Sequence, residues 1–301
     1  FAKDKTAPSL AYNVRPIVLK NNDVRRPAFH PKLSYLLLND SGLIIISGSN
    51  NLSFPAWTTS LEVFTITEFK NGIYYPRTIK DDYKRFIEFV NDIYGKEYTD
   101  AETAVLSFFR KVLYTKKIGQ YKGNYSSAQS SFFDKLEELK AENHAKKFKS
   151  VEIISPYFSS SVVVQNIRKY VDGDIKISIP YSANNVASVP KELFESYQKE
   201  NVLWSDVNVL NKEKVFRFNH SKIFRFYGED KVFTIIGSAN LSAAALDGYR
   251  NKGNVEFATI FSDMKNGRET DLLKIRSSFE DIVFEEETGE SEFDERRCPP
   301  E

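Results

Sequence analysis

Cysteine, histidine and methionine are scarce in this chain of 301 residues, which holds one cysteine, three histidines and one methionine. The single cysteine, Cys298, excludes an internal disulfide and a cysteine-based zinc cluster, so we expect no structural metal. No apolar run approaches the roughly 20 residues that cross a bilayer, and residues 1–10 lack a charged-then-apolar signal pattern. The sequence therefore predicts an intracellular, cytoplasmic protein that does not engage a membrane.

A large excess of charge of one sign is also lacking. The 42 basic and 41 acidic residues leave a net charge of +1, so global charge does not indicate a nucleic-acid partner. Acidic residues gather in the segment 280–301, which leaves the rest of the chain more basic and favours an anionic ligand there. The length exceeds that of a usual single domain and indicates two domains or a duplicated core.

An internal repeat accounts for two of the three histidines. His30 and His220 each open the pattern HxK, strand-like residues, a turn and GSxNLS, which ends at Ser53 in the first copy and at Ser242 in the second. The distance from the histidine to the glycine of GSxN is 18 residues in one copy and 17 in the other, a difference that a hairpin turn absorbs. Each copy is therefore predicted to be a β-hairpin that ends in a GSxN turn.

The residue types in this repeat suit a phosphate site. In a strand, residues i and i+2 point to the same face, so each HxK places an imidazole beside an ammonium group. Lysines neutralise phosphoryl oxygens, and the amides and hydroxyls of the GSxN turns can donate hydrogen bonds to them. One histidine can attack phosphorus while the other protonates the leaving oxygen. The candidate catalytic residues are His30, Lys32, Asn51, His220, Lys222 and Asn240, and the candidate substrate-binding hydroxyls belong to Ser49 and Ser238.

A glutamate follows each copy of the repeat, Glu62 in LEVF and Glu256 in NVEF. On a strand, such a carboxylate can hold the N–H of a histidine ring and fix its tautomer. We therefore add both glutamates to the catalytic set. The alternative is an exposed glutamate at the edge of a sheet.

The doubled HxK with a downstream GSxN and glutamate resembles the signature of the phospholipase D superfamily, and the resemblance covers both halves of the chain. The commonest form of that signature has an aspartate five residues after the lysine, where this chain has Leu37 and Tyr227. The form without the aspartate resembles tyrosyl-DNA phosphodiesterases. The segments NLSFPAWTTSLE and NLSAAALDG are also similar to the nuclease branch of the superfamily and to bacterial members linked to DNA restriction and defence.

The resemblance implies an α/β phospholipase D fold, in which two pseudo-symmetric mixed-sheet halves flanked by helices share one active site. It also implies a metal-independent phosphodiesterase that needs no cofactor and forms a covalent phosphohistidine intermediate. By the same analogy His30 is the nucleophile and His220 the general acid, an order that the near-symmetry of the two motifs leaves open. A pair with one neutral and one protonated ring predicts a bell-shaped dependence of rate on pH.

The rest of the chain fits two such halves with helices between them. We assign residues 1–66 to the first half, 67–150 to a helical insertion, 151–265 to the second half, and 266–301 to a C-terminal helix and acidic tail. Strands are expected at 14–19, 33–38, 43–47, 61–66, 151–156 and 175–180. Helices are expected at 80–94, from the capping box of Thr99 and Glu102 onward, and at 131–147, 161–171 and 190–199. Because few residues precede His30, we expect that the chain is a fragment or that another polypeptide supplies strands to the first half.

Between residues 114 and 125, tyrosines are interleaved with Lys116, Lys117 and Lys122, a composition suited to phosphate contact and base stacking. An ordinary exposed loop explains the same residues. The favoured function is a DNA nuclease within a larger restriction or defence protein, with DNA as its partner; further domains, subunits or a homo-oligomer are compatible with the sequence. The alternatives are a phospholipase or phosphatidyltransferase, and a nucleic-acid-binding module that recruits a partner such as a helicase.

Overall fold

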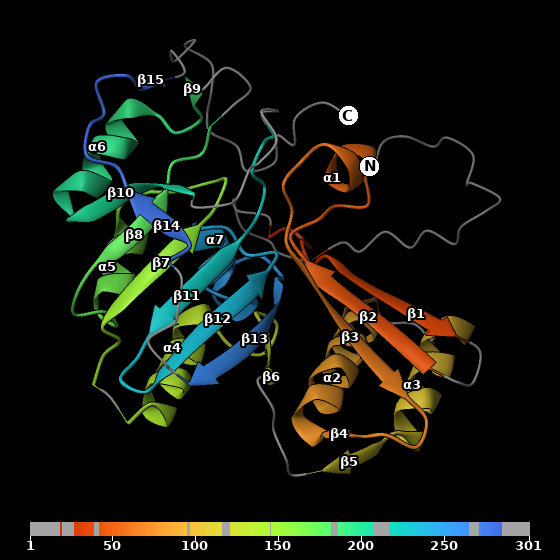
Figure 1. Cartoon of the computed structure of the whole chain (residues 1–301). Coiled ribbons are helices and arrows are strands. Elements are labelled where there is room, and N and C mark those ends of the chain that lie inside the picture. The colour runs from red at the N-terminus through yellow and green to blue at the C-terminus, as the bar shows by residue number, and fades with distance from the viewer. Residues whose placement is uncertain are drawn as a thin grey trace.

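The chain folds into two lobes that lie side by side, each built on its own β-sheet (Figure 1). The computed structural model describes residues 19, 27–38, 42–94, 97–115, 121–144, 146–181, 186–207, 217–264 and 271–284. The first lobe contains a three-stranded sheet in the order β1-β2-β3, and the second contains an eight-stranded sheet. Within these ranges, no helix combines the length and the apolar character that spanning a bilayer requires.

The first lobe begins with the hairpin that follows the first HxK motif. Its elements are β1 (Leu33–Leu38), β2 (Gly42–Gly48), the short helix α1 (Phe54–Thr58) and β3 (Phe64–Lys70). Both strand pairs are antiparallel. Because side chains alternate between the two faces of a strand, Leu43 and Ile45 point into the core, whereas Leu36 and Ile66 are exposed on the other face.

Two helices from the central part of the chain cover the buried face of this sheet. They are α2 (Arg77–Tyr94) and α3 (Asp100–Lys111), flanked by the parallel pair β4 (Tyr74–Pro76) and β5 (Leu113–Thr115). The predicted capping box starts α3, since the Thr99 hydroxyl accepts the backbone N–H of Glu102 and the Glu102 carboxylate accepts that of Thr99. The ring of Phe69 contacts the rings of Tyr83 and Phe109, so the sheet and both helices share one core.

The second lobe is a mixed sheet with helices packed against it. The strand order is β14-β10-β8-β7-β11-β12-β13-β6, with parallel pairs at β10–β8 and β8–β7 and antiparallel pairs elsewhere. These strands are β6 (Tyr121–Ser126), β7 (Ser150–Ile154), β8 (Ile175–Ser178), β10 (Val202–Val207), β11 (Ile223–Tyr227), β12 (Lys231–Gly237), β13 (Phe257–Met264) and β14 (Leu273–Ile275). A separate parallel pair joins β9 (Val186–Ala187) to β15 (Val283–Phe284).

The helices of this lobe share one core with its sheet. They are α4 (Phe132–Glu142), α5 (Val162–Arg168), α6 (Lys191–Lys199), α7 (Ala243–Leu246) and the 3-10 turn η1 (Tyr249–Asn251). Phe132 of α4 packs on Phe224 and Phe226 of β11, and Phe194 of α6 stacks on Trp204 of β10. The core of the second lobe therefore extends from β10 to β13 under these helices.

The two lobes meet through equivalent parts of the repeat. Phe257, at the start of β13, packs against Tyr83 and Phe86 of α2. Thr65 in β3 and Thr259 in β13 share a buried hydroxyl hydrogen bond of 3.0 Å. Each of these threonines lies three residues after a candidate glutamate, so the bond joins symmetry-equivalent positions of the two halves. This junction brings the two motif copies to the same place.

The predicted α/β architecture with two pseudo-symmetric halves is confirmed, and both hairpins form as expected. Some boundaries differ, since the strand expected at 61–66 is β3 and the helix expected at 131–147 ends at Glu142. The segment 67–150 supplies α2 and α3 to the first lobe and β6 and α4 to the second.

The C-terminal helix expected after residue 266 is wrong for residues 271–284, which form β14 and β15. The reason is tertiary: Leu273 is buried where β14 pairs with the edge strand β10, so the sheet determines the local conformation. The strand expected at 14–19, apart from Leu19, and the acidic tail beyond residue 284 lie outside the described residues.

Candidate active site

The two HxK motifs lie in equivalent places, just ahead of β1 and β11 rather than within them. The backbone N–H of His30 donates to Val255 O at 2.9 Å, and that of His220 donates to Leu61 O at 2.9 Å. Each acceptor residue immediately precedes a candidate glutamate. Each HxK motif is therefore positioned by the segment that leads into the third strand of the opposite half.

Each histidine is bound by the glutamate of the opposite half. His30 Nδ1 lies 3.0 Å from Glu256 Oε2, and His220 Nδ1 lies 2.8 Å from Glu62 Oε1. The side chains of Glu62 and Glu256 are 5% and 0% exposed, which excludes the alternative of surface glutamates at a sheet edge. A carboxylate that accepts the Nδ1–H of an imidazole fixes the tautomer and leaves Nε2 to meet a substrate.

The two GSxN serines hold these glutamates. The hydroxyls of Ser49 and Ser238 donate to Oε2 of Glu62 and Glu256, respectively, and both serines are buried. Each hydroxyl also accepts the backbone N–H of the residue that follows its glutamate. This arrangement corrects the substrate-binding role predicted for the two serines, because their hydroxyls are used to position the carboxylates.

The lysine of each HxK motif folds back toward its own histidine. Lys32 Nζ donates to His30 O at 3.0 Å, and Lys222 Nζ donates to His220 O at 2.7 Å. Lys222 is buried, whereas Lys32 is partly exposed and lines a cavity. Two ammonium groups beside two imidazoles make this part of the molecule electrostatically suited to a phosphate anion.

Burial determines the protonation of the second motif. Desolvation, assisted by the Lys222 ammonium, lowers the pKa of His220 to about 4 even though its glutamate partner opposes the change. His220 is therefore neutral at pH 7 in the free protein. Burial would raise the pKa of Glu256, but its interactions with His30, the Lys32 ammonium and the Ser238 hydroxyl lower that pKa below its ordinary value. The Lys32 ammonium contributes to lowering the pKa of both His220 and Glu256, so its charge acts on residues of both halves.

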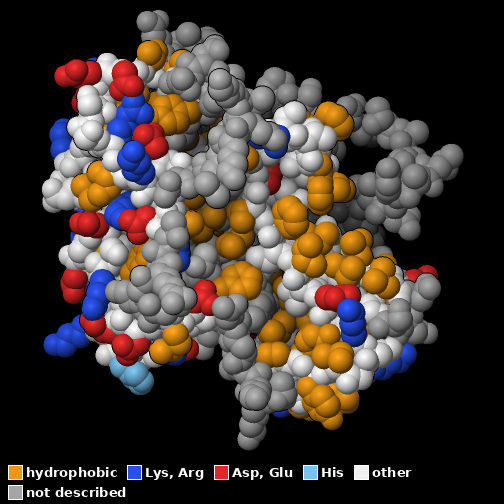
Figure 2. Space-filling view, in the orientation of Figure 1, with side chains coloured by type: hydrophobic (Ala, Val, Ile, Leu, Met, Phe, Trp, Pro, Cys, Tyr) orange, Lys and Arg blue, Asp and Glu red, His pale blue; other side chains and the backbone are white. Residues whose placement is uncertain are grey.

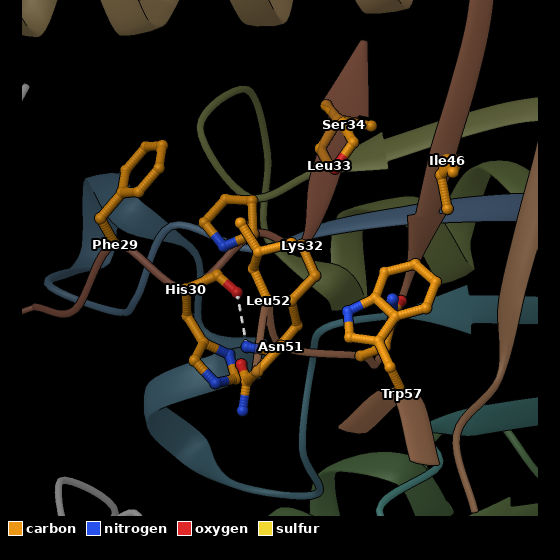
Figure 3. A pocket seen from close by; sticks show the side chains of 11 residues that line it. Phe29, His30, Lys32, Leu33, Ser34, Ile46, Asn51, Leu52 and Trp57 are labelled. Carbon is orange, nitrogen blue, oxygen red and sulfur yellow. Dashed lines mark hydrogen bonds between the residues drawn. The ribbon is translucent and has the colours of Figure 1, made fainter. Parts of the chain in front are cut away.

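A cavity of about 330 Å³ opens beside His30 (Figure 3). Lys32 and Asn51 from the first motif copy line it. Asn240, the equivalent of Asn51, is buried, and its Oδ1 has no hydrogen-bond partner within the described part of the chain. The two GSxN asparagines therefore occupy different environments in spite of the repeat.

Three residues at the site were not identified from the repeat. Trp57 of α1 and Ser34 of β1 line the cavity, and the ring of Tyr157 lies 6.1 Å from that of His220. Tyr157 lies three residues beyond the end of β7, and a polar aromatic residue just beyond a predicted strand is the signal that could have indicated it. Ser34 carries no signal of its own, because its alternation pattern is that of any exposed strand position.

The structure leaves untested the lysines predicted to contact phosphate between residues 114 and 125. Lys116 and Lys117 lie outside the described residues, and for Lys122 only the backbone, within β6, is described. Across the ranges that the structure covers, no group of three His, Cys, Asp or Glu side chains is arranged to hold a metal ion.

The second half of the chain matches a known protein family. Residues 139–273, which run from the end of α4 to the start of β14, match the family described as cardiolipin synthase, PLD-like domain. This range contains the second HxK motif with its GSxN turn and glutamate, and the first half repeats that set around the same site. Residues 139–273 are therefore a phospholipase D-like domain.

Solved structures of the superfamily show the same fold over most of the chain. Yeast tyrosyl-DNA phosphodiesterase superposes with a TM-score of 0.55 at 14% identity, over 79% of this chain and 68% of that chain. Two mutant forms of the yeast enzyme give TM-scores of 0.52 and 0.51 at 14% and 16% identity, over 82% and 79% of this chain and 69% and 68% of theirs. No curated protein matches the sequence. At these identities the likeness establishes the phospholipase D fold, and members of this superfamily are phosphodiesterases.

Proposed function

We propose that this phospholipase D-like chain cleaves DNA through a covalent phosphohistidine, without a metal ion. The crossed pairing of histidines and glutamates carries the proposal: each imidazole is held at Nδ1 by a buried carboxylate and has a motif lysine beside it. Two imidazoles with fixed tautomers supply a nucleophile and a general acid, and the ammonium groups offset the charge of a phosphodiester.

The proposed cleavage takes place in two steps, formation of the phosphohistidine and its hydrolysis. First, Nε2 of His30 attacks phosphorus and the bond to the leaving oxygen breaks, while that oxygen takes the proton from Nε2 of His220. Then neutral His220 accepts a proton from water, the water oxygen bonds to phosphorus, and the phosphorus–nitrogen bond breaks. The products are an alcohol and a phosphomonoester, and both histidines return to their starting states. The order of the two histidines follows the family resemblance.

The lowered pKa of His220 links substrate binding to proton uptake. The first step needs a protonated His220, but burial keeps this ring neutral in the free protein at pH 7. A bound phosphodiester adds a negative charge to that of Glu62, and both charges favour the imidazolium form. We therefore expect a proton to be taken up when substrate binds.

Two observations support DNA as the substrate. The solved enzyme that the chain resembles over most of its length is named a tyrosyl-DNA phosphodiesterase. The aspartates of the commonest superfamily signature are replaced by Leu37 and Tyr227. The Tyr227 hydroxyl donates to buried Glu152 at 2.6 Å, so Tyr227 is part of the buried interior of the second lobe. A place in a larger restriction or defence protein rests on the motif resemblance alone.

Phosphatidyl transfer is the second candidate function. The family that matches residues 139–273 is described by the name cardiolipin synthase, which favours a lipid phosphodiester. The same two-histidine chemistry would serve it, with an alcohol in place of water in the second step. The replaced aspartates weigh against this reading.

The test is cleavage of labelled single- and double-stranded DNA in excess EDTA. We compare the unaltered chain with His30→Ala and His220→Ala, and with His144→Ala as a control because His144 is exposed on the turn after α4. EDTA-resistant cleavage that both active-site variants lose and the control retains supports the proposal. His220→Asn should in addition trap label on the protein, whereas His30→Asn should not. Cleavage that survives in either active-site variant contradicts the mechanism, and turnover of phosphatidylglycerol vesicles without DNA cleavage favours the second candidate.

A further inference from the structure

The two copies of the NLS segment differ in exposure. Leu52 is 93% exposed, whereas its equivalent Leu241 is fully buried, and Trp57 is 51% exposed, whereas its equivalent Leu246 is fully buried. Exposed hydrophobic side chains gather over the first lobe, where this segment lies (Figure 2). The same segment is therefore buried in the second half and exposed on the surface in the first half.

The difference arises because another segment of the chain covers the second copy. The backbone N–H of Ser159 donates to Leu241 O, and the Ser159 hydroxyl accepts the N–H of Ala243, so the segment after β7 lies directly on this turn. In the described part of the first half, the equivalent turn keeps its side chains exposed. A tryptophan that the fold does not bury is then available for a ligand.

Trp57 forms one wall of the cavity beside His30. Figure 3 shows its indole across the cavity from His30, with Lys32 and Asn51 between them. The Trp57 ring packs against Phe64 with centroids 6.3 Å apart, which supports it from the side of β3. A supported planar side chain therefore stands next to the nucleophile and a lysine.

The other residues that line the cavity indicate which kind of ligand it can bind. Ser34, Asn50 and Asn51 line the same cavity beside apolar residues such as Leu33 and Ile46, and their hydrogen-bonding groups suit the polar edge of a nucleobase. Base–aromatic stacking accepts any base, because every base has a π-face. A cavity of about 330 Å³ lies at the lower end of ligand-site volumes and suits a single nucleoside.

We propose that Trp57 stacks on an unpaired base next to the scissile phosphate, so that the substrate is single-stranded or frayed nucleic acid. Within a duplex both faces of a base are already stacked, and the base must leave the stack to reach such a wall. This inference rests on the proposed function, because the base and the phosphate must belong to one substrate.

The first test uses an oligonucleotide with a single phosphodiester flanked by methylphosphonate linkages, and a matched oligonucleotide that is abasic on both sides of that phosphodiester. Trp57→Ala should lower kcat/KM for the base-containing substrate by about 5- to 100-fold, as expected for one stacked base, and leave the abasic substrate nearly unchanged. Trp57→Phe should restore most of the loss. Phe54→Ala is the matched control, because Phe54 is an exposed aromatic on the same helix that does not line the cavity. An equal loss on both substrates, or no loss on either, overturns the inference.

A binding measurement separates this inference from the proposed function. The chain has two tryptophans, and Trp204 is buried, so quenching of emission by an oligonucleotide reports on Trp57. In the His30→Ala variant, single-stranded DNA should quench the emission, whereas abasic DNA and blunt duplex should not. If the unaltered chain cleaves no nucleic acid and base-dependent quenching persists, the proposed function fails and the stacking site stands. If the emission responds to phosphatidylglycerol vesicles and not to DNA, the stacking site fails.

Discussion

Acid should destabilise the native protein through His220, because folding lowers the pKa of this ring. The pKa of a histidine in an unfolded chain is about 6.5, and burial with the charge of Lys222 lowers it to about 4 in the native state. Between these values the unfolded state binds more protons, so the free energy of unfolding falls as the pH falls from about 6.5 to about 4. The full shift corresponds to about 3 kcal/mol, of which about 2 kcal/mol is already lost at pH 5 relative to pH 8.

Urea unfolding at pH 8, 6 and 5 measures this linkage. His220→Asn removes the titrating ring and keeps an amide that can donate to Glu62, so its free energy of unfolding should fall by about 2 kcal/mol less than that of the unaltered chain between pH 8 and pH 5. His144→Asn is the matched control, because His144 is exposed and has a φ of 53°, which asparagine accepts. The control should follow the unaltered chain. Parallel curves for the unaltered chain and His220→Asn would refute the reasoning, since the buried ring would then have no proton linkage.

The crossed pairs lead to three further expectations. Glu256→Gln should slow formation of the phosphohistidine, and Glu62→Gln should slow both its formation and its hydrolysis, each by about 100-fold or more. Rapid-quench experiments with labelled substrate measure the two steps separately. Unaffected rates would contradict the crossed assignment. Ser238→Ala should lower the free energy of unfolding by about 1–3 kcal/mol, because the buried carboxylate of Glu256 loses its hydroxyl donor; an unchanged urea midpoint would show that this donor is dispensable. In EDTA, kcat/KM should fall as the pH rises above about 4, because His220 of the free protein loses there the proton that the first step requires; a fall that begins only above pH 7 would contradict the environment described for this ring.

Local spacing was sufficient to predict the elements that carry the motifs. The hairpins β1–β2 and β11–β12 follow from two apolar runs separated by a turn, and their register needs no information from elsewhere in the chain. The start of α3 follows equally locally, since a capping box requires only Thr99 and Glu102 at the right separation. Where tertiary contacts determine the conformation, as for Leu273 in β14, the local pattern was misleading.

The crossing of the site could not be predicted from spacing. Because the two copies are nearly alike, nothing in the sequence distinguishes a glutamate that holds the histidine of its own half from one that holds the histidine of the other. The contact between Ser49 and Glu62 could not be predicted for a similar reason. From the sequence alone, a hydroxyl beside a phosphate site is expected to bind the phosphate, and only the fold places Glu62 next to it. The exposure of Trp57 depends on which turn another segment covers, and that is a property of the assembled lobes.

The crossed pairs make the active site a property of both halves together. Neither half contains a histidine with its own carboxylate, so a native histidine tautomer at either motif requires the junction at which Thr65 meets Thr259. The motifs are symmetric, but their surroundings are not. The ring of His220 is 12% exposed and that of His30 is 29% exposed, and a cavity lined by Trp57 opens beside His30. In the proposed mechanism, this difference in burial gives a symmetric pair of imidazoles a direction: the substrate lies beside the more exposed ring, and the buried ring exchanges protons with the leaving group.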